Sequence, residues 1–249
     1  MPLTHRVRVG TSGWSYDHWR DRFYPHDMSQ RDWLGHYASQ FRSVEINSTF
    51  YRLPSEDTLR TWHDSVPPDF EFSVKASRYI THTKKLRDPR QTLPPLLERI
   101  SLLGGKLGPI LFQLPPCWRR NVDRLAEFLD ALGTDFRHAF EFRDRSWFDD
   151  DILALLEDHR AAFCIYDLAG YCAPPFVTGD FVYVRLHGPD APYRGCYTDS
   201  GLAQWHRAIA NWQAGGHDVY CYFDNDEAGY APNNALALQA LFTSRESTR

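Results

Sequence analysis

Hydrophobic and polar positions along the chain follow two alternating patterns. Eight short runs rich in β-branched and aromatic residues are typical of β-strands. These runs cover residues 7–10, 43–48, 70–76, 109–114, 139–143, 162–167, 181–187 and 219–224. Between most of them, apolar residues recur every three or four positions, as in Trp33, Leu34, Tyr37 and Phe41, which predicts helices. Eight strand–helix units in 249 residues predict an α/β fold, a single (β/α)8 TIM barrel rather than an open sheet.

One connection breaks this alternation. Only 13 residues separate Asp167 from Phe181, and they include Gly170, Pro174 and Gly179. Because glycine and proline interrupt helices, we expect a helix-poor crossover between the sixth and seventh strands. The chain shows no repeat or linker, so we expect one domain over 1–249, with a core at about 7–242 and a short polar tail at 244–249.

Polar and charged residues mark the carboxyl ends of the predicted strands. Charge in a buried strand costs several kcal/mol unless it is paired or faces a ligand pocket. In a (β/α)8 barrel the reactive groups lie at these ends and on the loops that follow. The candidates are Ser12, Trp14, Glu45, Asn47, Lys75, Gln113, Glu141, Arg143, Asp167, Arg185, His187, Asp224 and Asn225, with His82 in the loop after the third strand. The competing interpretation is a ring of satisfied ion pairs inside the barrel.

The chemistry of these side chains favours an anionic ligand. Arginine, lysine and histidine donors, here Arg143, Arg185 and His187, suit phosphate or carboxylate. Glu45, Glu141, Asp167 and Lys75 are the candidate catalytic residues for proton transfer, and the other candidates are assigned to substrate binding. We therefore expect an enzyme that acts on a small anionic molecule, such as a sugar phosphate or nucleotide fragment, by proton abstraction, isomerisation or hydrolysis.

Several short motifs resemble those of the DUF72 family of YecE-like proteins, in order along nearly the whole chain. They are Gly10-Thr11-Ser12-Gly13-Trp14, Val44-Glu45-Ile46-Asn47-Ser48-Thr49-Phe50-Tyr51, Ser73-Val74-Lys75, Phe112-Gln113-Leu114-Pro115-Pro116, Glu141-Phe142-Arg143, Arg185-Leu186-His187-Gly188 and Phe223-Asp224-Asn225-Asp226. The resemblance implies a TIM barrel but no established reaction. Where the family often has an Asn-Asn pair, this chain has Asp224-Asn225, which adds a negative charge.

The composition of the chain limits the kinds of ligand and partner that we expect. The net charge is −4, which disfavours nucleic acid as a ligand, although a nucleic-acid-binding or endonuclease IV-like repair protein remains the alternative, together with a non-catalytic metabolite sensor. The five cysteines lack paired spacing and are interpreted as reduced thiols. No apolar leader or membrane span is present, so we expect a cytoplasmic protein without a membrane partner. The oligomeric state is not indicated.

Three further interpretations stay open. No cofactor is predicted, but Glu45, Glu141, Asp167, His187 and Asp224 are the residues that would hold a divalent metal if one bound. The aromatic residues Trp14, Tyr16, Trp19, Phe23 and Tyr24 would form either a lid over the ligand or a packed hydrophobic plug. Asn233 and Asn234 are interpreted as a helix cap.

Overall fold

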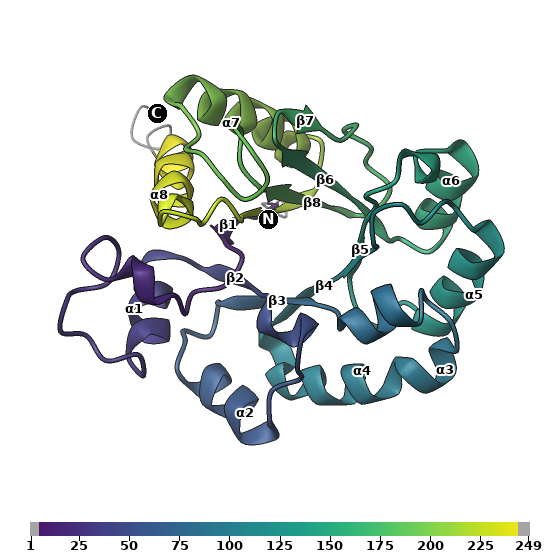
Figure 1. Cartoon of the computed structure of the whole chain (residues 1–249), viewed down its shortest axis with the longest axis horizontal. Coiled ribbons are helices and arrows are strands. Elements are labelled where there is room, and N and C mark those ends of the chain that lie inside the picture. The colour runs from purple at the N-terminus through teal and green to yellow at the C-terminus, as the bar shows by residue number, and fades with distance from the viewer. Residues whose placement is uncertain (1–4, 244–249) are drawn as a thin grey trace. The chain divides into compact units, whose positions relative to one another are not determined.

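The structure, a computed structural model, describes residues 5–243 (Figure 1). Each of the eight predicted strands is present, with ends within two residues of the expected ones. They are β1 (Val7–Thr11), β2 (Ser43–Ile46), β3 (Glu71–Lys75), β4 (Leu107–Gln113), β5 (His138–Glu141), β6 (Ala162–Leu168), β8 (Phe181–Leu186) and β9 (Asp218–Phe223). The polar tail predicted at 244–249 lies outside the described residues.

Helices separate the strands along the chain. They are α1 (Trp33–Gln40), α2 (Glu56–Asp64), α3 (Pro89–Thr92), α4 (Pro94–Ile100), α5 (Val122–Leu132), α6 (Asp150–Asp158), α7 (Asp199–Ala214) and α8 (Tyr230–Thr243). Several begin at a residue that caps the first turn, for example Asn121, whose Oδ1 accepts a hydrogen bond from the Arg124 amide (2.9 Å). This succession is the predicted α/β alternation.

The crossover between β6 and β8 contains no helix, as predicted. Instead, residues Tyr171–Cys172 form the short strand β7, which pairs antiparallel with the end of β6. Asp167 lies opposite Cys172 in this hairpin. The turn between the strands uses Ala169 and Gly170, both with positive φ (54° and 76°).

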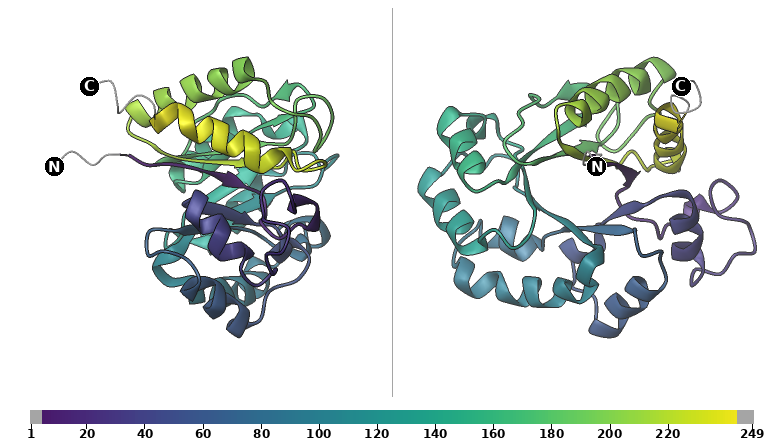
Figure 2. Two further views of the ribbon diagram at one scale, coloured as in Figure 1. Left: turned by 90° about the vertical axis from the view of Figure 1, so that its left-hand side faces the viewer. Right: turned by 180° about the vertical axis from the view of Figure 1, so that it is seen from behind.

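The described chain falls into two compact units. Unit 1 comprises Met1–Val44, Ile165–Pro174 and Phe181–Arg249, of which 5–243 are described. In it β9 pairs in parallel with β1 and with β8, in a register that places Arg185 beside Tyr222. The helices α7 and α8 lie side by side, and α8 packs on β1 (Figure 2). The carboxyl ends of β1, β8 and β9 therefore share one edge.

Unit 2 comprises Glu45–Cys164 and Pro175–Asp180. Its strands β3, β4 and β5 pair in parallel, and Gln113 lies beside Glu141 in the register. Helices α2 to α6 line one side of these strands (Figure 1). Phe112 stacks on Phe140 (centroids 5.2 Å apart), and both rings are fully buried. The expectation of one domain over 1–249 stays a prediction.

The aromatic loop after β1 forms a packed plug within unit 1 rather than an exposed lid. Trp19 and Tyr24 are buried, and the Tyr24 ring stacks on Trp33 with centroids 4.7 Å apart. Trp14 is also buried, and its carbonyl oxygen accepts a hydrogen bond from the Tyr24 hydroxyl (2.5 Å). These rings anchor α1 to the strand edge of unit 1.

All five cysteines are free thiols. Cys164 and Cys221 are buried in their strands, whereas Cys117, Cys172 and Cys196 are exposed. Among residues 5–243, no helix is both long enough and apolar enough to cross a lipid bilayer.

Candidate functional site

The predicted site residues divide between the two units. Unit 1 contains Ser12, Trp14, Asp167, Arg185, His187, Asp224 and Asn225, and unit 2 contains Glu45, Asn47, Lys75, His82, Gln113, Glu141 and Arg143. In each unit these residues lie at or just after the carboxyl ends of strands.

Arg185, His187 and Asp224 form a buried charged cluster in unit 1. The Arg185 Nη2 donates to Asp224 Oδ2 (3.0 Å) and to the Ser12 hydroxyl (3.2 Å). The His187 Nδ1 lies 3.0 Å from the same Asp224 oxygen. Arg185 and His187 are fully buried, whereas Asp224 keeps 9% of its surface. Each charge thus has a partner, which burial requires.

The cluster also determines which His187 nitrogen carries the proton. Arg185 Nη1 can only donate, and it faces His187 Nε2 at 3.4 Å. Nε2 therefore presents its lone pair to the guanidinium, and Nδ1–H donates to Asp224. Because both ring nitrogens are engaged within the protein, His187 orients Asp224 and is placed to position other groups rather than to transfer a proton itself.

Asp167 ends β6 close to this cluster. Burial raises the pKa of its carboxyl group, and a hydrogen bond from the Tyr197 side chain partly opposes that rise. The Tyr197 hydroxyl also accepts a hydrogen bond from the Gly188 amide (3.1 Å). The loop after β8 thereby holds a phenol against a carboxyl group whose proton affinity is increased, which suits an acid–base role.

The same loop covers His187. Tyr193 is a non-glycine residue with φ of 65°, and its ring meets the His187 ring edge-on at 5.4 Å. Gly188 and Gly195 flank the loop with φ of 115° and 89°. A Cβ at Gly188 would collide with the Arg194 backbone, so only glycine fits there.

Asn225 and Asn234 form a second polar pair in unit 1. Asn225 Nδ2 donates to Gly195 O and to Asn234 Oδ1, both at 2.9 Å. Asn234 Oδ1 also accepts from the Tyr197 amide (3.1 Å). Asn234 lies inside α8, which begins at Tyr230, so the predicted helix cap at Asn233 and Asn234 is wrong. The Asn234 side chain instead holds the loop after β8, because it is buried against that loop.

In unit 2, Lys75 and His82 meet on one aromatic ring. The Lys75 ammonium lies over the face of Phe50 (4.5 Å), and His82 contacts the same ring edge-on (5.1 Å). Burial lowers the pKa of His82, and the charges of Lys75 and Arg78 lower it further. His82 belongs to a π-helical turn, Tyr79–Thr83, a distortion that is frequent at functional sites.

Glu141 ends β5 in the interior of unit 2. It is fully buried, and its Oε1 accepts a hydrogen bond from Arg143 Nε. The Cys164 thiol lies 4.0 Å from Oε2. Glu45 is likewise fully buried at β2, and Gln113 Nε2 donates weakly to the Leu114 carbonyl (3.4 Å).

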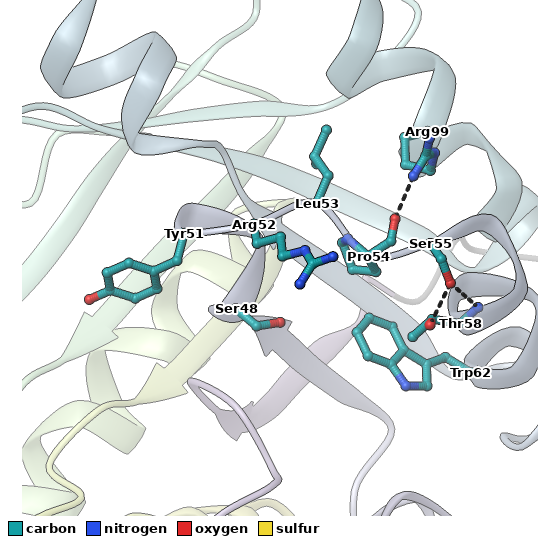
Figure 3. A pocket seen from close by; sticks show the side chains of 9 residues that line it. All are labelled: Ser48, Tyr51, Arg52, Leu53, Pro54, Ser55, Thr58, Trp62 and Arg99. Carbon is teal, nitrogen blue, oxygen red and sulfur yellow. Dashed lines mark hydrogen bonds between the residues drawn. The ribbon is translucent and has the colours of Figure 1, made fainter.

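Asn47, directly after β2, places a buried Oδ1 that accepts no hydrogen bond from any group within residues 5–243. Residues that follow Asn47 line a cavity of about 700 Å³ in unit 2 (Figure 3). Its lining is Ser48, Tyr51, Arg52, Leu53, Pro54, Ser55, Thr58, Trp62 and Arg99. Two arginines and no carboxylate line it, so its electrostatics favour an anion.

In the described part of the chain, no group of three or more His, Cys, Asp or Glu side chains is arranged to hold a metal ion.

Sequence patterns missed or misassigned several residues of these clusters. Tyr197 lies in a loop, where no strand-end rule applies, and Asn234 was assigned to a helix cap although it lies inside α8 and contacts the loop after β8. His18 and Asp226 contact one another across two loops, and only the motif position of Asp226, two residues after Asp224, hinted at a role.

The topology and the placement of these groups define the class of protein to which the chain belongs. Eight strands alternate with helices, and charged residues gather at the carboxyl ends of the strands, as in (β/α)8 TIM-barrel proteins. A crystal structure of a DUF72 family protein from Thermotoga maritima matches with a TM-score of 0.86 and 28% identity, covering 96% of this chain and 100% of that chain. One from Enterococcus faecalis matches with a TM-score of 0.81 and 21% identity, covering 95% of each chain. The predicted fold class is thus confirmed.

The sequence comparisons agree with this assignment. The model of the family described as "Protein of unknown function DUF72" matches residues 8–249. The UPF0759 protein YunF of Bacillus subtilis is 28% identical over 94% of both chains. The UPF0759 protein YecE of Escherichia coli K12 is 33% identical over 46% of this chain and 43% of its own. The chain belongs to the DUF72 family.

Proposed function

We propose that this protein is an enzyme that uses acid–base chemistry on a small anionic substrate resembling a sugar phosphate or nucleotide. The observation that carries the proposal is the buried cluster of Arg185, His187 and Asp224 beside Asp167. Burying this many ionisable groups costs stability, and a merely structural strand end would be cheaper with apolar residues. Buried ionisable groups with perturbed proton affinity cluster at sites that bind or convert a ligand, and this association supports the proposal.

The roles follow from the local environment of each group. Asp167, with its raised pKa, holds a proton more readily than an exposed aspartate and serves as an acid or base. In unit 2, Lys75 supplies positive charge for a substrate anion or for negative charge that develops during reaction. Glu141 and Glu45 are further candidate proton carriers there, and Arg52 and Arg99 add positive charge to the cavity of the same unit.

A thermal-shift screen tests the proposal. Aldose phosphates, ketose phosphates, nucleoside monophosphates and inorganic phosphate are added singly, since a ligand that binds only the folded protein raises its melting temperature. We expect at least one compound to raise the melting temperature by several degrees. At a concentration 100 times its Kd, such a ligand stabilises the folded protein by about 2.7 kcal/mol. A ligand bound in unit 1 is expected to lose most of its shift with Asp167→Asn, and a ligand bound in unit 2 with Lys75→Ala. Both variants are expected to fold.

Lys84→Ala is the matched control for Lys75→Ala. Lys84 lies in the same unit, pairs with Asp88 at 2.8 Å and is about one-third exposed. It should keep the full shift. If no compound in the panel stabilises the parent, or if both site variants respond as the parent does, the proposed substrate class and site are wrong. For a compound that does stabilise the parent, NMR of the compound after incubation with the protein shows whether it has been converted. An enzyme changes the compound, whereas a non-catalytic sensor leaves it unchanged.

A further inference from the structure

The cavity of unit 2 is lined by residues other than the strand-end candidates. Its walls come from the segment that joins β2 to α2, from α2 itself and from Arg99 on α4. Among residues 5–243, its lining includes none of the strand-end residues named above. Its volume of about 700 Å³ lies within the range of small-molecule sites, roughly 300–1,000 Å³. This cavity, called the α2 cavity below, is therefore large enough to hold a ligand of its own.

Hydrogen bonds hold the walls of the α2 cavity together. Arg99 Nη1 donates to the Pro54 carbonyl (2.6 Å) and so ties α4 to the segment before α2 (Figure 3). Ser55 caps α2, because its Oγ accepts a hydrogen bond from the Thr58 amide (3.2 Å) and lies 2.8 Å from the Thr58 hydroxyl. The cavity is thus built into the folded chain and needs no rearrangement to admit a ligand.

Arg52 brings an unpaired positive charge to the cavity. Within residues 5–243, its guanidinium makes no hydrogen bond or ion pair. The acids nearest to it along the chain, Glu56 and Asp57, instead lie 3.2 and 3.8 Å from the terminal nitrogens of Arg60. Because the lining holds no carboxylate, an entering anion is attracted by Arg52 and is not repelled by the lining. The planar fork of a guanidinium suits a carboxylate or phosphate group.

Trp62 adds an aromatic wall to the cavity. Its side chain is half-buried, and the Arg52 guanidinium points toward Pro54 and Trp62 (Figure 3). Tyr51 also contributes to the lining, but it points away from them and is 75% exposed. A flat apolar group that covers such surface is stabilised, since aromatic rings stack and water is released. A ligand that combines a planar ring with an anionic group therefore fits both features of the cavity.

The competing interpretation is that Arg52 is an ordinary solvated surface residue. Arg60 shows how such a residue behaves in this part of unit 2, because it is 57% exposed, lies outside the cavity lining and pairs with Glu56. Arg52 instead points toward an aromatic ring and has no acidic partner within residues 5–243. Tryptophan and arginine are among the side chains that are enriched where binding energy concentrates. These differences favour a ligand site over a solvated surface charge.

We propose that the α2 cavity binds a small aromatic anion, an aryl carboxylate or aryl phosphate, with the charged group on Arg52 and the ring against Trp62. Arg99 holds the Pro54 wall in place and adds a second positive charge to the lining. Binding in this cavity does not rest on the proposed function, because it uses none of the strand-end residues.

Titration calorimetry with four probes tests the ligand class. Naphthoate and naphthyl phosphate carry both a planar ring and a negative charge, whereas naphthol lacks the charge at neutral pH and cyclohexanecarboxylate lacks the aromatic ring. We expect at least one of the two aromatic anions to bind with a Kd of about 1 mM or below, as probes of this size allow. Naphthol and cyclohexanecarboxylate are expected to bind at least about fivefold more weakly, since each loses one of the two interactions. The tighter of the two aromatic anions identifies the charged group that the site prefers.

Variants of the lining test the placement of the ligand. Arg52→Gln is expected to weaken binding of the aromatic anion by about five- to twentyfold, because the charged fork is lost. Trp62→Leu is expected to weaken it by about three- to tenfold, because leucine keeps an apolar side chain but removes the ring. Circular dichroism and urea titration show that each variant is folded. Arg60→Gln is the matched control, an arginine of the same helix outside the lining, and it should bind the probe as the parent does.

Several results would overturn the proposal. They are a parent protein that binds neither aromatic anion, an Arg52→Gln variant that binds as the parent does, and naphthol that binds as tightly as naphthoate. Loss of binding in Lys75→Ala, with Arg52→Gln unaffected, would assign the probe to the strand ends and would overturn it as well. If the thermal-shift screen fails while naphthoate binds through Arg52, the proposed function is wrong and the α2 cavity site stands. If the screen succeeds and neither aromatic anion binds, only the α2 cavity site is wrong.

Discussion

Some ionisable side chains of this protein are buried with a charged partner, and others are buried in an apolar environment. At the carboxyl ends of the strands, Arg185 and Asp224 are buried but paired. At the start of β5, His138 is buried in an apolar environment beside Phe112, and its Nε2 has no hydrogen-bond partner in the described structure. Burial lowers the pKa of His138 to about 4. Its neutral form is therefore part of the folded core.

This residue predicts a loss of stability in acid. The unfolded chain takes up the proton near the ordinary histidine pKa of about 6.5, whereas the folded chain resists until about pH 4. The stabilising contribution is thus complete above pH 6.5 and disappears as the pH falls towards 4, an effect of up to about 3 kcal/mol. We expect His138→Phe to lose less free energy of unfolding between pH 7 and 4 than the parent, as measured by urea titration.

His63→Gln is the control, because His63 is a partly exposed histidine of the same unit. It should follow the parent across the whole pH range. Parallel curves for the parent and His138→Phe would show that His138 does not cause the acid sensitivity.

At the scale of elements, the loop after β8 and the helix α7 that follows it use glycine differently. Gly188 has φ of 115° and no room for a Cβ, because the Arg194 backbone is in the way. Gly201 lies in the first turn of α7, and the nearest atom to an added Cβ is 3.5 Å away. The loop requires glycine, whereas the helix merely tolerates it.

Alanine at these two positions should therefore have opposite effects. Gly188→Ala is expected to lower the free energy of unfolding by about 1–3 kcal/mol, since the residue must leave its φ region or displace Arg194. Gly201→Ala is expected to raise it by about 0.5–1 kcal/mol, since alanine is the better helix former. Chemical denaturation measures both. A Gly188→Ala protein as stable as the parent would show that the loop rearranges freely.

Sequence reasoning succeeded for elements that bury apolar residues and failed for the short polar ones. All eight strands contain buried apolar residues and were predicted, and so was α1, with Trp33, Leu34 and Tyr37 on its buried face. Helix α2 buries only Leu59, and the two-residue β7 depends on backbone pairing, so neither leaves a strong pattern. Strand-end positions indicated Lys75 and Asp167, but loop-to-loop contacts such as His18 with Asp226 depend on tertiary structure.

At the scale of the whole molecule, charge decides between the candidate ligands. The 28 lysines and arginines are outnumbered by 32 aspartates and glutamates. Basic groups gather locally, for example Arg78 and Lys84 around the exposed Tyr79, without a net positive field over the chain. A small anion can bind at such a local basic group. A long polyanion covers more of the surface and is repelled by its net negative charge.

Single-stranded DNA should consequently bind no more tightly than at a non-specific level. With a labelled 20-nucleotide strand, we expect Kd weaker than about 10⁻⁶ M at 150 mM salt. Fluorescence anisotropy at 50 and 150 mM salt measures the affinity and its salt dependence. Submicromolar binding at the higher concentration would favour the nucleic-acid alternative over a small-molecule enzyme.

The three exposed thiols, Cys117, Cys172 and Cys196, have a practical consequence for every measurement suggested above. In air, solvent-accessible sulfhydryls on separate molecules couple to one another or accumulate oxygen, and metal traces accelerate both routes. Preparations kept without a reductant should thus develop covalent multimers and extra mass. Fresh dithiothreitol, or serine at these three positions, would keep the material homogeneous.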